Sequence, residues 1–153
     1  MSQLIFSYAA NLNPALIASR CSKPECIGLA RLPDHALAFF DYSKRWDGGA
    51  ATLISSPGTD LWGVVYRLSF SDSERLDAWL DVHLDGTGDY FLLPTEVIDA
   101  DGAIHSVMLY RKFYHGGPQQ PPSTGYLQTI LDGAVARGLP AAYIESVRQI
   151  PAR

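Results

Sequence analysis

The chain has 153 residues, of which 47% are hydrophobic and 18% are charged, and its formal net charge is −4. These values are typical of one globular domain spanning residues 1–153, and the acidic balance argues against nucleic-acid binding because phosphate contact needs a basic surface. No apolar run approaches the roughly 18 residues of a membrane span, and the N-terminus lacks a secretion-signal pattern, so we expect a cytoplasmic location and no membrane partner.

The two cysteines, Cys21 and Cys26, are separated by four residues. The pair fits a disulfide, half of a metal site, or two unpaired thiols in a reducing compartment. Structural zinc usually takes four ligands, so we favour unpaired thiols and expect no metal and no other cofactor.

The N-terminal segment is predicted to be a strand that leads into a helix. Residues 4–8 form a short apolar run, and Pro14, with Asn13 as its cap, favours a helix from residue 15 to about Cys21. Unpaired N–H groups at such a junction suit an anion.

Four strands and a helix are predicted to follow. The strands are residues 26–32, 36–42, 50–54 and 61–68, with Pro57-Gly58 as a turn between the last two. The helix is predicted to begin with Ser71 or Asp72 as its cap. Its apolar face follows i, i+3, i+4 spacing, with Leu76, Trp79 and Leu80. It runs into residues 81–89, a loop crowded with ionisable groups.

The C-terminal half is predicted to contain one hairpin and two helices. Residues 90–99 and 103–113 flank an Asp-Gly dipeptide that favours a hairpin turn. The first helix covers residues 126–137 and ends at Gly138, and the second covers residues 141–150. Mostly strands with a few short helices indicate an α+β fold.

Several motifs resemble those of γ-glutamylcyclotransferases. They are Phe6-x-Tyr8-x-x-Asn11-Leu12, Trp46-x-Gly48-Gly49-x-Ala51-Thr52, Ser56-Pro57-Gly58, Trp62-Gly63-Val64-Val65, Leu76-Asp77, Pro121-Pro122-Ser123-x-x-Tyr126 and Gly138-Leu139-Pro140. They occur in the family's order over nearly the whole chain. The resemblance implies a small mixed β-barrel with short helices packed outside it.

The resemblance also implies where a substrate binds. The family holds the substrate carboxylate on backbone N–H groups at the end of the first strand, where its Gly and Ser are Ala9 and Ala10 here. The implied substrate-binding residues are Ser7, Tyr8, Ala9, Ala10, Asn11, Leu12, Leu80, Tyr90 and Tyr126.

The family's catalytic glutamate follows the Leu-Asp pair by three residues, and Leu80 occupies that position in this sequence. Leucine cannot carry a proton, so activity requires another base. Asp81 and Asp85 are the first candidates and His83 is the third, because an imidazole titrates near neutral pH. The alternative is that these residues belong to a solvated loop without a catalytic role.

The resemblance implies an enzyme in which the α-amine of a γ-glutamyl compound attacks its own γ-carbonyl, giving 5-oxoproline and a free amine or amino acid. Two alternatives remain open: a barrel that binds a small molecule without turnover, and an enzyme with altered acyl-amine or lactam chemistry in a biosynthetic pathway. The expected partner is a small γ-glutamyl or related acyl-amine substrate, and the chain is expected to be a monomer or a homodimer.

Overall fold

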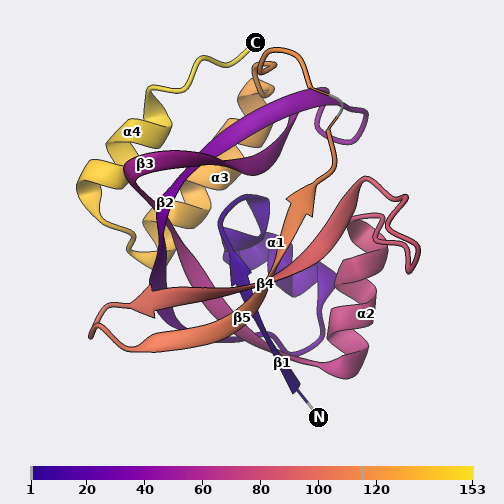
Figure 1. Ribbon diagram of the computed structural model, residues 1–153, viewed down its shortest axis with the longest axis vertical. Coiled ribbons are helices and arrows are strands. Elements are labelled where there is room, and N and C mark those ends of the chain that lie inside the picture. Colours follow the sequence, from indigo (N-terminus) through magenta and orange to yellow (C-terminus); the bar gives the residue numbers. More distant parts are fainter. Residues whose placement is uncertain (1, 115) are drawn as a thin grey trace.

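A five-stranded closed barrel forms the centre of the computed structural model, which describes residues 2–114 and 116–153 (Figure 1). Its strands are β1 (Ser2–Ser7), β2 (Glu25–Ser43), β3 (Gly48–Ser69), β4 (Tyr90–Asp99) and β5 (Ile104–Lys112). They follow the order β1-β3-β2-β4-β5. The strands β1 and β5 run parallel, and the other neighbours are antiparallel, so the predicted mixed barrel is confirmed.

The long β2–β3 hairpin replaces the four strands predicted over residues 26–68, and that part of the prediction is wrong. Four residues of β3, 56–59, stand opposite the single Asp34 of β2. The Asp34 carboxylate accepts a hydrogen bond from the N–H of Gly58 at 2.9 Å, and Gly58 has a φ of 83°. Pro57-Gly58 therefore forms a bulge, because the extra residues loop out while the pairing resumes on both sides.

Short helices pack against the barrel and against one another. They are the 3₁₀ turn η1 (Ala10–Leu12), α1 (Pro14–Arg20), α2 (Phe70–Trp79), α3 (Thr124–Arg137) and α4 (Ala141–Arg148). The predicted cap of α1 is confirmed, since Asn13 Oδ1 accepts from the N–H of Ala15 at 3.1 Å. The predicted cap of α2 is wrong: Ser69 caps it, and its hydroxyl accepts from the N–H of Asp72 at 3.1 Å.

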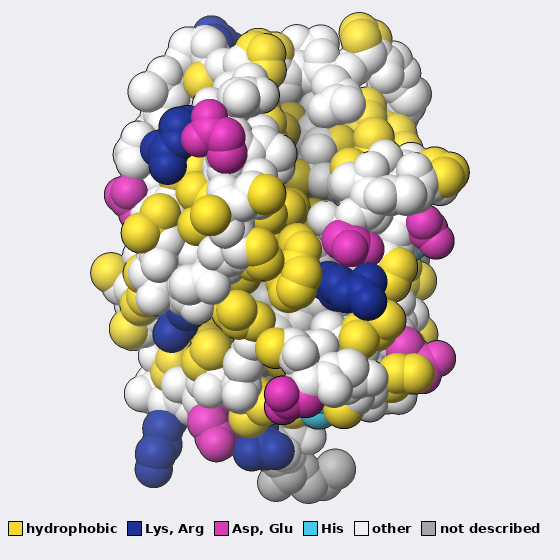
Figure 2. Space-filling model, turned by 90° about the vertical axis from the view of Figure 1, so that its left-hand side faces the viewer, with side chains coloured by type: hydrophobic (Ala, Val, Ile, Leu, Met, Phe, Trp, Pro, Cys, Tyr) yellow, Lys and Arg dark blue, Asp and Glu magenta, His cyan; other side chains and the backbone are white. Residues whose placement is uncertain are grey.

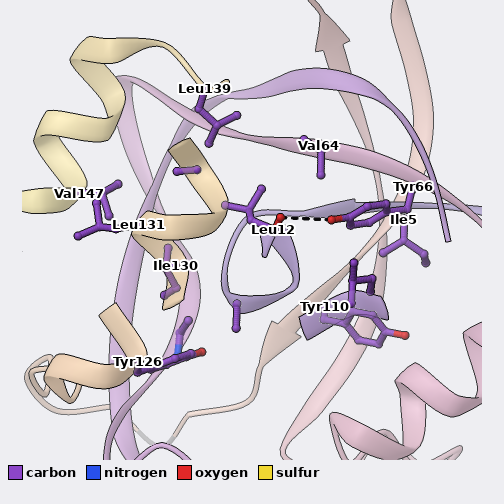
Figure 3. Packing of buried hydrophobic residues seen from close by; sticks show 14 of the residues in the cluster. Ile5, Leu12, Val64, Tyr66, Tyr110, Tyr126, Ile130, Leu131, Leu139 and Val147 are labelled. Carbon is purple, nitrogen blue, oxygen red and sulfur yellow. Dashed lines mark hydrogen bonds between the residues drawn. The ribbon is translucent and has the colours of Figure 1, made fainter. Parts of the chain in front are cut away.

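The 3₁₀ turn η1 is held firmly at one end of the barrel. The buried Tyr66 hydroxyl donates to the carbonyl of Asn11 at 2.6 Å. It also lies 3.5 Å from the carbonyl of Leu12, the contact drawn as a dashed line in Figure 3. A methyl group on Gly133 of α3 would come within 2.6 Å of the Asn13 nitrogen, so α3 packs directly on this turn. The connection after β1 consequently has a defined conformation.

The charged side chains do not form a single-sign patch on the face that Figure 2 draws, and the two cysteines are not paired. On the face drawn in Figure 2, basic and acidic side chains are interspersed and neither sign gathers into one patch. Cys21 is buried, Cys26 is exposed, and the two thiols are not joined. Across residues 2–114 and 116–153, no helix is long and apolar enough to cross a membrane.

Candidate active site

A cavity of about 580 Å³ opens beside the connection that follows β1. Residues 7–11 line it together with the β2–β3 hairpin tip, the C-terminal end of α2, β5 and α3. Of the substrate-binding residues implied by the family resemblance, those that line it are Ser7, Tyr8, Ala9, Ala10, Asn11, Leu80, Tyr90 and Tyr126, and the candidate base Asp81 lines it as well. Segments far apart in the sequence thus meet around one space.

The connection after β1 lines the cavity with Ala9, Ala10 and Asn11. Among the described residues, no hydrogen bond uses the N–H groups of Ala9, Ala10 or Asn11. Leu12 differs: its N–H donates to the carbonyl of Ala9 at 3.0 Å, its side chain is fully buried, and it does not line the cavity. The 3₁₀ turn occupies the Leu12 donor, so Leu12 is removed from the predicted set.

Three cavity tyrosines, Tyr8, Tyr90 and Tyr126, are largely buried and neutral. The hydroxyls of Tyr8 and Tyr90 donate to main-chain carbonyls, at 2.5 Å to that of Tyr110 and 2.6 Å to that of Ala51. Burial raises the pKa of all three hydroxyls, that of Tyr126 to about 12. These side chains therefore contribute shape and neutral hydroxyls, and none is a base near pH 7.

The helix α2 ends at the cavity in a Schellman motif. The N–H of Val82 donates to the carbonyl of Asp77 at 3.0 Å, and that of Asp81 donates to the carbonyl of Ala78 at 3.3 Å. Asp81 has a φ of 54°, in the left-handed region where glycine is usual. This reversal of the chain brings both Leu80 and Asp81 to the cavity wall, although adjacent residues of a continuous helix would point about 100° apart.

The Asp81 carboxylate is paired on both oxygens. One oxygen lies 2.7 Å from Nε2 of His83, and the other accepts from the N–H of Asp89 at 3.1 Å. The hydrogen bond from His83, together with that from Asp89, lowers the pKa of Asp81, and the same carboxylate raises the pKa of His83. The pair is thus a carboxylate and an imidazole ring joined by one contact, each of which favours the charged form of the other.

Asp85 lies away from the cavity. Its carboxylate accepts from the N–H and the hydroxyl of Thr87, at 3.1 and 2.7 Å, within its own exposed loop. Neither Asp85 nor His83 is among the lining residues. The loop folds back on itself here, so of the three predicted bases only Asp81 reaches the cavity.

Comparison with known proteins identifies the family. Residues 60–147 match the sequence model of the AIG2-like family. The γ-glutamylcyclotransferase of Mus musculus is 33% identical over 151 residues, covering 96% of this chain and 78% of the relative. The chain belongs to the γ-glutamylcyclotransferase family. The protein of that name from Homo sapiens is 32% identical over 153 residues, covering 97% of this chain and 79% of the relative.

The fold comparison agrees with this membership. A solved structure described as a γ-glutamyl cyclotransferase superposes with a TM-score of 0.91 at 30% identity, covering 100% of this chain and 90% of the other. The family resemblance noted in the sequence is therefore confirmed, and so is the barrel that it implied.

Several residues that line the cavity were not among the predicted site residues. Tyr110 lines the wall and donates its hydroxyl to Asp77, and burial raises the pKa of both groups. Trp46 stacks on Tyr126 with ring centroids 4.3 Å apart. The cations Arg20, Lys44, Arg45 and Lys112 also line the cavity. Among these residues, only Trp46 lies in a family motif that the sequence shows. The others line the cavity because distant elements meet there, which no local pattern predicts.

Metal ligands do not cluster in this part of the molecule. Over residues 2–114 and 116–153, no group of three or more His, Cys, Asp or Glu side chains is arranged to hold a metal ion. The polar and charged residues that line the cavity include tyrosines, cationic residues, Ser7, Asn11, Ser43, Asp81 and Asp89.

Proposed function

We propose that this protein is a γ-glutamylcyclotransferase that converts a γ-glutamyl compound into 5-oxoproline and a free amine or amino acid. The α-amine attacks the γ-carbonyl of the same molecule, a five-membered lactam forms, and the bond to the leaving amine breaks. The observation that carries the proposal is the cavity shared by residues 7–11 and Asp81 in a chain of this family.

The shape of the cavity supports an intramolecular reaction. A volume of about 580 Å³ suits a small molecule. Packed aromatic walls, including Trp46 stacked on Tyr126, would hold the γ-glutamyl chain bent so that amine and carbonyl meet. Holding two reacting groups together in this way is worth up to about 10⁵–10⁸ M in effective concentration.

The backbone of Ala9, Ala10 and Asn11 is proposed to hold the α-carboxylate of the γ-glutamyl group. Its three N–H groups have no partner within the described structure, and the three residues line the cavity. N–H groups fixed in place bind an anion without reorganising, and the replacement of the family's Gly and Ser by alanine leaves such main-chain donors intact.

Asp81 is proposed as the base. It would accept a proton from the attacking ammonium group and return one to the leaving amine, a role typically worth about 10²–10⁴-fold in rate. The left-handed turn at Asp81 supports this role, because it brings a carboxylate to the cavity next to Leu80. The family resemblance implies a glutamate at the Leu80 position. His83 would orient the carboxylate through their 2.7 Å contact.

The test is product formation from a panel of γ-glutamyl amines, amino acids and dipeptides, with 5-oxoproline measured by mass spectrometry. Wild type should form 5-oxoproline, and Asp81→Asn should lose at least about 100-fold in kcat. Asn tolerates the left-handed conformation, so this variant removes the base and keeps the turn. Asp85→Asn is the matched control and should retain the wild-type rate.

Leu80 favours a second candidate, a protein that binds the same ligands without turnover. It lines the cavity with an apolar side chain, at the position where the family resemblance implies a proton carrier. Calorimetric binding of 5-oxoproline or a γ-glutamyl amino acid, with no product from any member of the panel, would support this candidate over the enzyme.

A further inference from the structure

Asp77 is a half-buried carboxylate of α2 without a cationic partner. Across residues 2–114 and 116–153, no ion pair includes it. Its Oδ1 accepts a hydrogen bond from the hydroxyl of Tyr110 in β5. Burial raises the pKa of Asp77, the Tyr110 hydrogen bond partly offsets this rise, and the Glu74 carboxylate adds to it. A carboxylate in such surroundings favours a positive group of a ligand nearby.

Tyr110 connects Asp77 to the cavity. Tyr110 lines the cavity and is 6% exposed, whereas Asp77 is not among the lining residues. Figure 3 shows the hydroxyl end of the Tyr110 ring directed toward α2. An ionised carboxylate only accepts hydrogen bonds, so the hydroxyl hydrogen of Tyr110 is held by Asp77. Any ligand group that contacts the Tyr110 oxygen must therefore donate a hydrogen to it.

Two other cavity tyrosines have the same polarity. The hydroxyls of Tyr8 and Tyr90 donate to the main-chain carbonyls of Tyr110 and Ala51. Because the protein already uses the hydrogens of all three hydroxyls, each oxygen offers a ligand only lone pairs. A primary ammonium group, which has three N–H donors and a positive charge, matches acceptors that lie beside a carboxylate.

The link between Tyr110 and Asp77 fits the proposed reaction. The main-chain carbonyl of Asp77 accepts one hydrogen bond of the Schellman motif that brings Asp81 to the cavity. The main-chain carbonyl of Tyr110 accepts from Tyr8, which directly precedes the backbone of residues 9–11. The link thus joins the proposed base to the proposed α-carboxylate site. In a γ-glutamyl group, the α-amine and the α-carboxylate are bonded to the same carbon.

We propose that the Tyr110 hydroxyl oxygen accepts a hydrogen bond from the α-ammonium group of the γ-glutamyl substrate, and that Asp77 positions Tyr110 for this contact. The inference rests on the proposed function. Tyr110 is the residue that touches the substrate, and Asp77 acts through Tyr110 by holding its hydroxyl hydrogen. The ammonium group donates one hydrogen to Tyr110 while another passes to Asp81. Ligands that lack the α-amine therefore bind more weakly than ligands that carry it.

The test compares two ligands that differ only in the ammonium group, L-glutamate and glutarate. Neither carries a leaving amine, so calorimetry at pH 7 measures binding without turnover. Wild type should bind glutamate about tenfold more tightly than glutarate, as expected for a hydrogen bond from a charged donor. Tyr110→Phe should remove most of this preference by weakening glutamate binding, and it should leave the affinity for glutarate unchanged.

Asp77→Asn tests the positioning role. Asn has nearly the same size but donates as well as accepts, so it no longer holds the Tyr110 hydrogen in one direction. This variant should weaken glutamate binding several-fold and leave glutarate binding unchanged. In the Tyr110→Phe background it should have little further effect, because Asp77 acts through Tyr110. Glu74→Gln is the control: it removes an exposed carboxylate of α2 that does not line the cavity, and it should change neither affinity.

Equal weakening of both ligands in Tyr110→Phe or Asp77→Asn, with urea denaturation showing a folded protein, would mean a structural link only and would overturn the inference. Additive effects in the double variant, equal affinities of wild type for the two ligands, or no binding of either would also overturn it. If one variant does not fold, wild type and the other variant still decide. Formation of 5-oxoproline tests the proposed function separately, since a glutamate preference that both variants lose supports the inference even without product.

Discussion

Gly88 packs against the main-chain carbonyl of Asp81 so closely that a methyl group on residue 88 would overlap the carbonyl oxygen. The same methyl would come within 2.8 Å of the His83 ring. The loop that follows α2 thus returns onto its own first residue. This contact, together with the left-handed backbone of Asp81, holds the proposed base at the cavity wall.

Gly88→Ala should therefore displace Asp81. The backbone must shift to admit the methyl, which costs about 1–3 kcal/mol in unfolding free energy, and a base moved by even about 1 Å loses roughly 100-fold in rate. Urea denaturation and 5-oxoproline formation measure the two effects. Gly125→Ala is the control: its Cβ meets nothing within 4 Å in α3, so stability and rate should be kept. A Gly88→Ala variant with wild-type kcat would contradict the role of this contact.

The Asp81–His83 pair predicts a pH dependence that NMR can measure. The raised pKa of His83 means that the pair stabilises the fold fully below the ordinary histidine value of about 6.5, and that this contribution is lost as pH rises through the raised pKa. Asp81 sets the low-pH limit of this stabilisation. Because its pKa is lowered in the folded protein, the stabilisation from its carboxylate is lost as pH falls through that lowered pKa.

Titration of the imidazole C–H signals should give His83 a pKa above 6.5 in wild type and a value near 6.5 in Asp81→Asn. Asp85→Asn should lower it much less, because Asp85 acts on His83 only through its more distant charge. An unchanged His83 titration in Asp81→Asn would show that the two side chains do not pair in solution.

Leu80→Glu tests which position supplies the proton carrier. If Asp81 is the base, a second carboxylate beside it disfavours ionisation of both, and kcat should stay within about threefold of wild type or fall. Leu80→Gln is the neutral control of the same length. A rise in kcat of more than about tenfold for Leu80→Glu but not for Leu80→Gln would mean that a carboxylate at residue 80, and not Asp81, is the better placed base.

Asp72 predicts a stability effect outside the cavity. Its fully buried carboxylate accepts from the N–H groups of Ser22 and Lys23, at 2.9 and 3.0 Å, and from Nη1 of Arg75 at 2.7 Å. Asp72→Asn should lower the free energy of unfolding by about 2–4 kcal/mol, since the charged hydrogen bonds that join α2 to the segment following α1 are weakened. The exposed Asp132→Asn should have little effect.

Acid pH should reduce the difference in unfolding free energy between wild type and Asp72→Asn. Burial raises the pKa of Asp72, but the hydrogen bonds from Ser22, Lys23 and Arg75 outweigh it and hold the pKa below its ordinary value of about 3.9. The stabilisation is therefore present above that value and is lost as pH falls through the lowered pKa. Urea denaturation at pH 7 and near pH 3 should show the gap between wild type and Asp72→Asn narrowing; a constant gap would contradict this account.

Local signals in the sequence determined the elements whose ends depend only on neighbouring residues. Asn13 and Pro14 start α1 as predicted, because a cap needs one side-chain oxygen and two nearby N–H groups. Gly138 ends α3 with a φ of 75°, a conformation that glycine adopts without strain. The motifs, taken in order, also indicated the barrel that the fold comparison confirms.

Only the tertiary structure decided the shape of the β2–β3 hairpin, the environment of Trp79 and the assembly of the cavity. Pro57-Gly58 is a turn signal, yet pairing with Asp34 across the hairpin makes it a bulge in one long strand. Trp79 has helical spacing typical of a core residue, but it is 45% exposed and stacked with Arg45. No local pattern encodes such contacts, because they join residues distant in sequence, and only closure of the barrel brings α1, the hairpin tip and the end of α2 around one cavity.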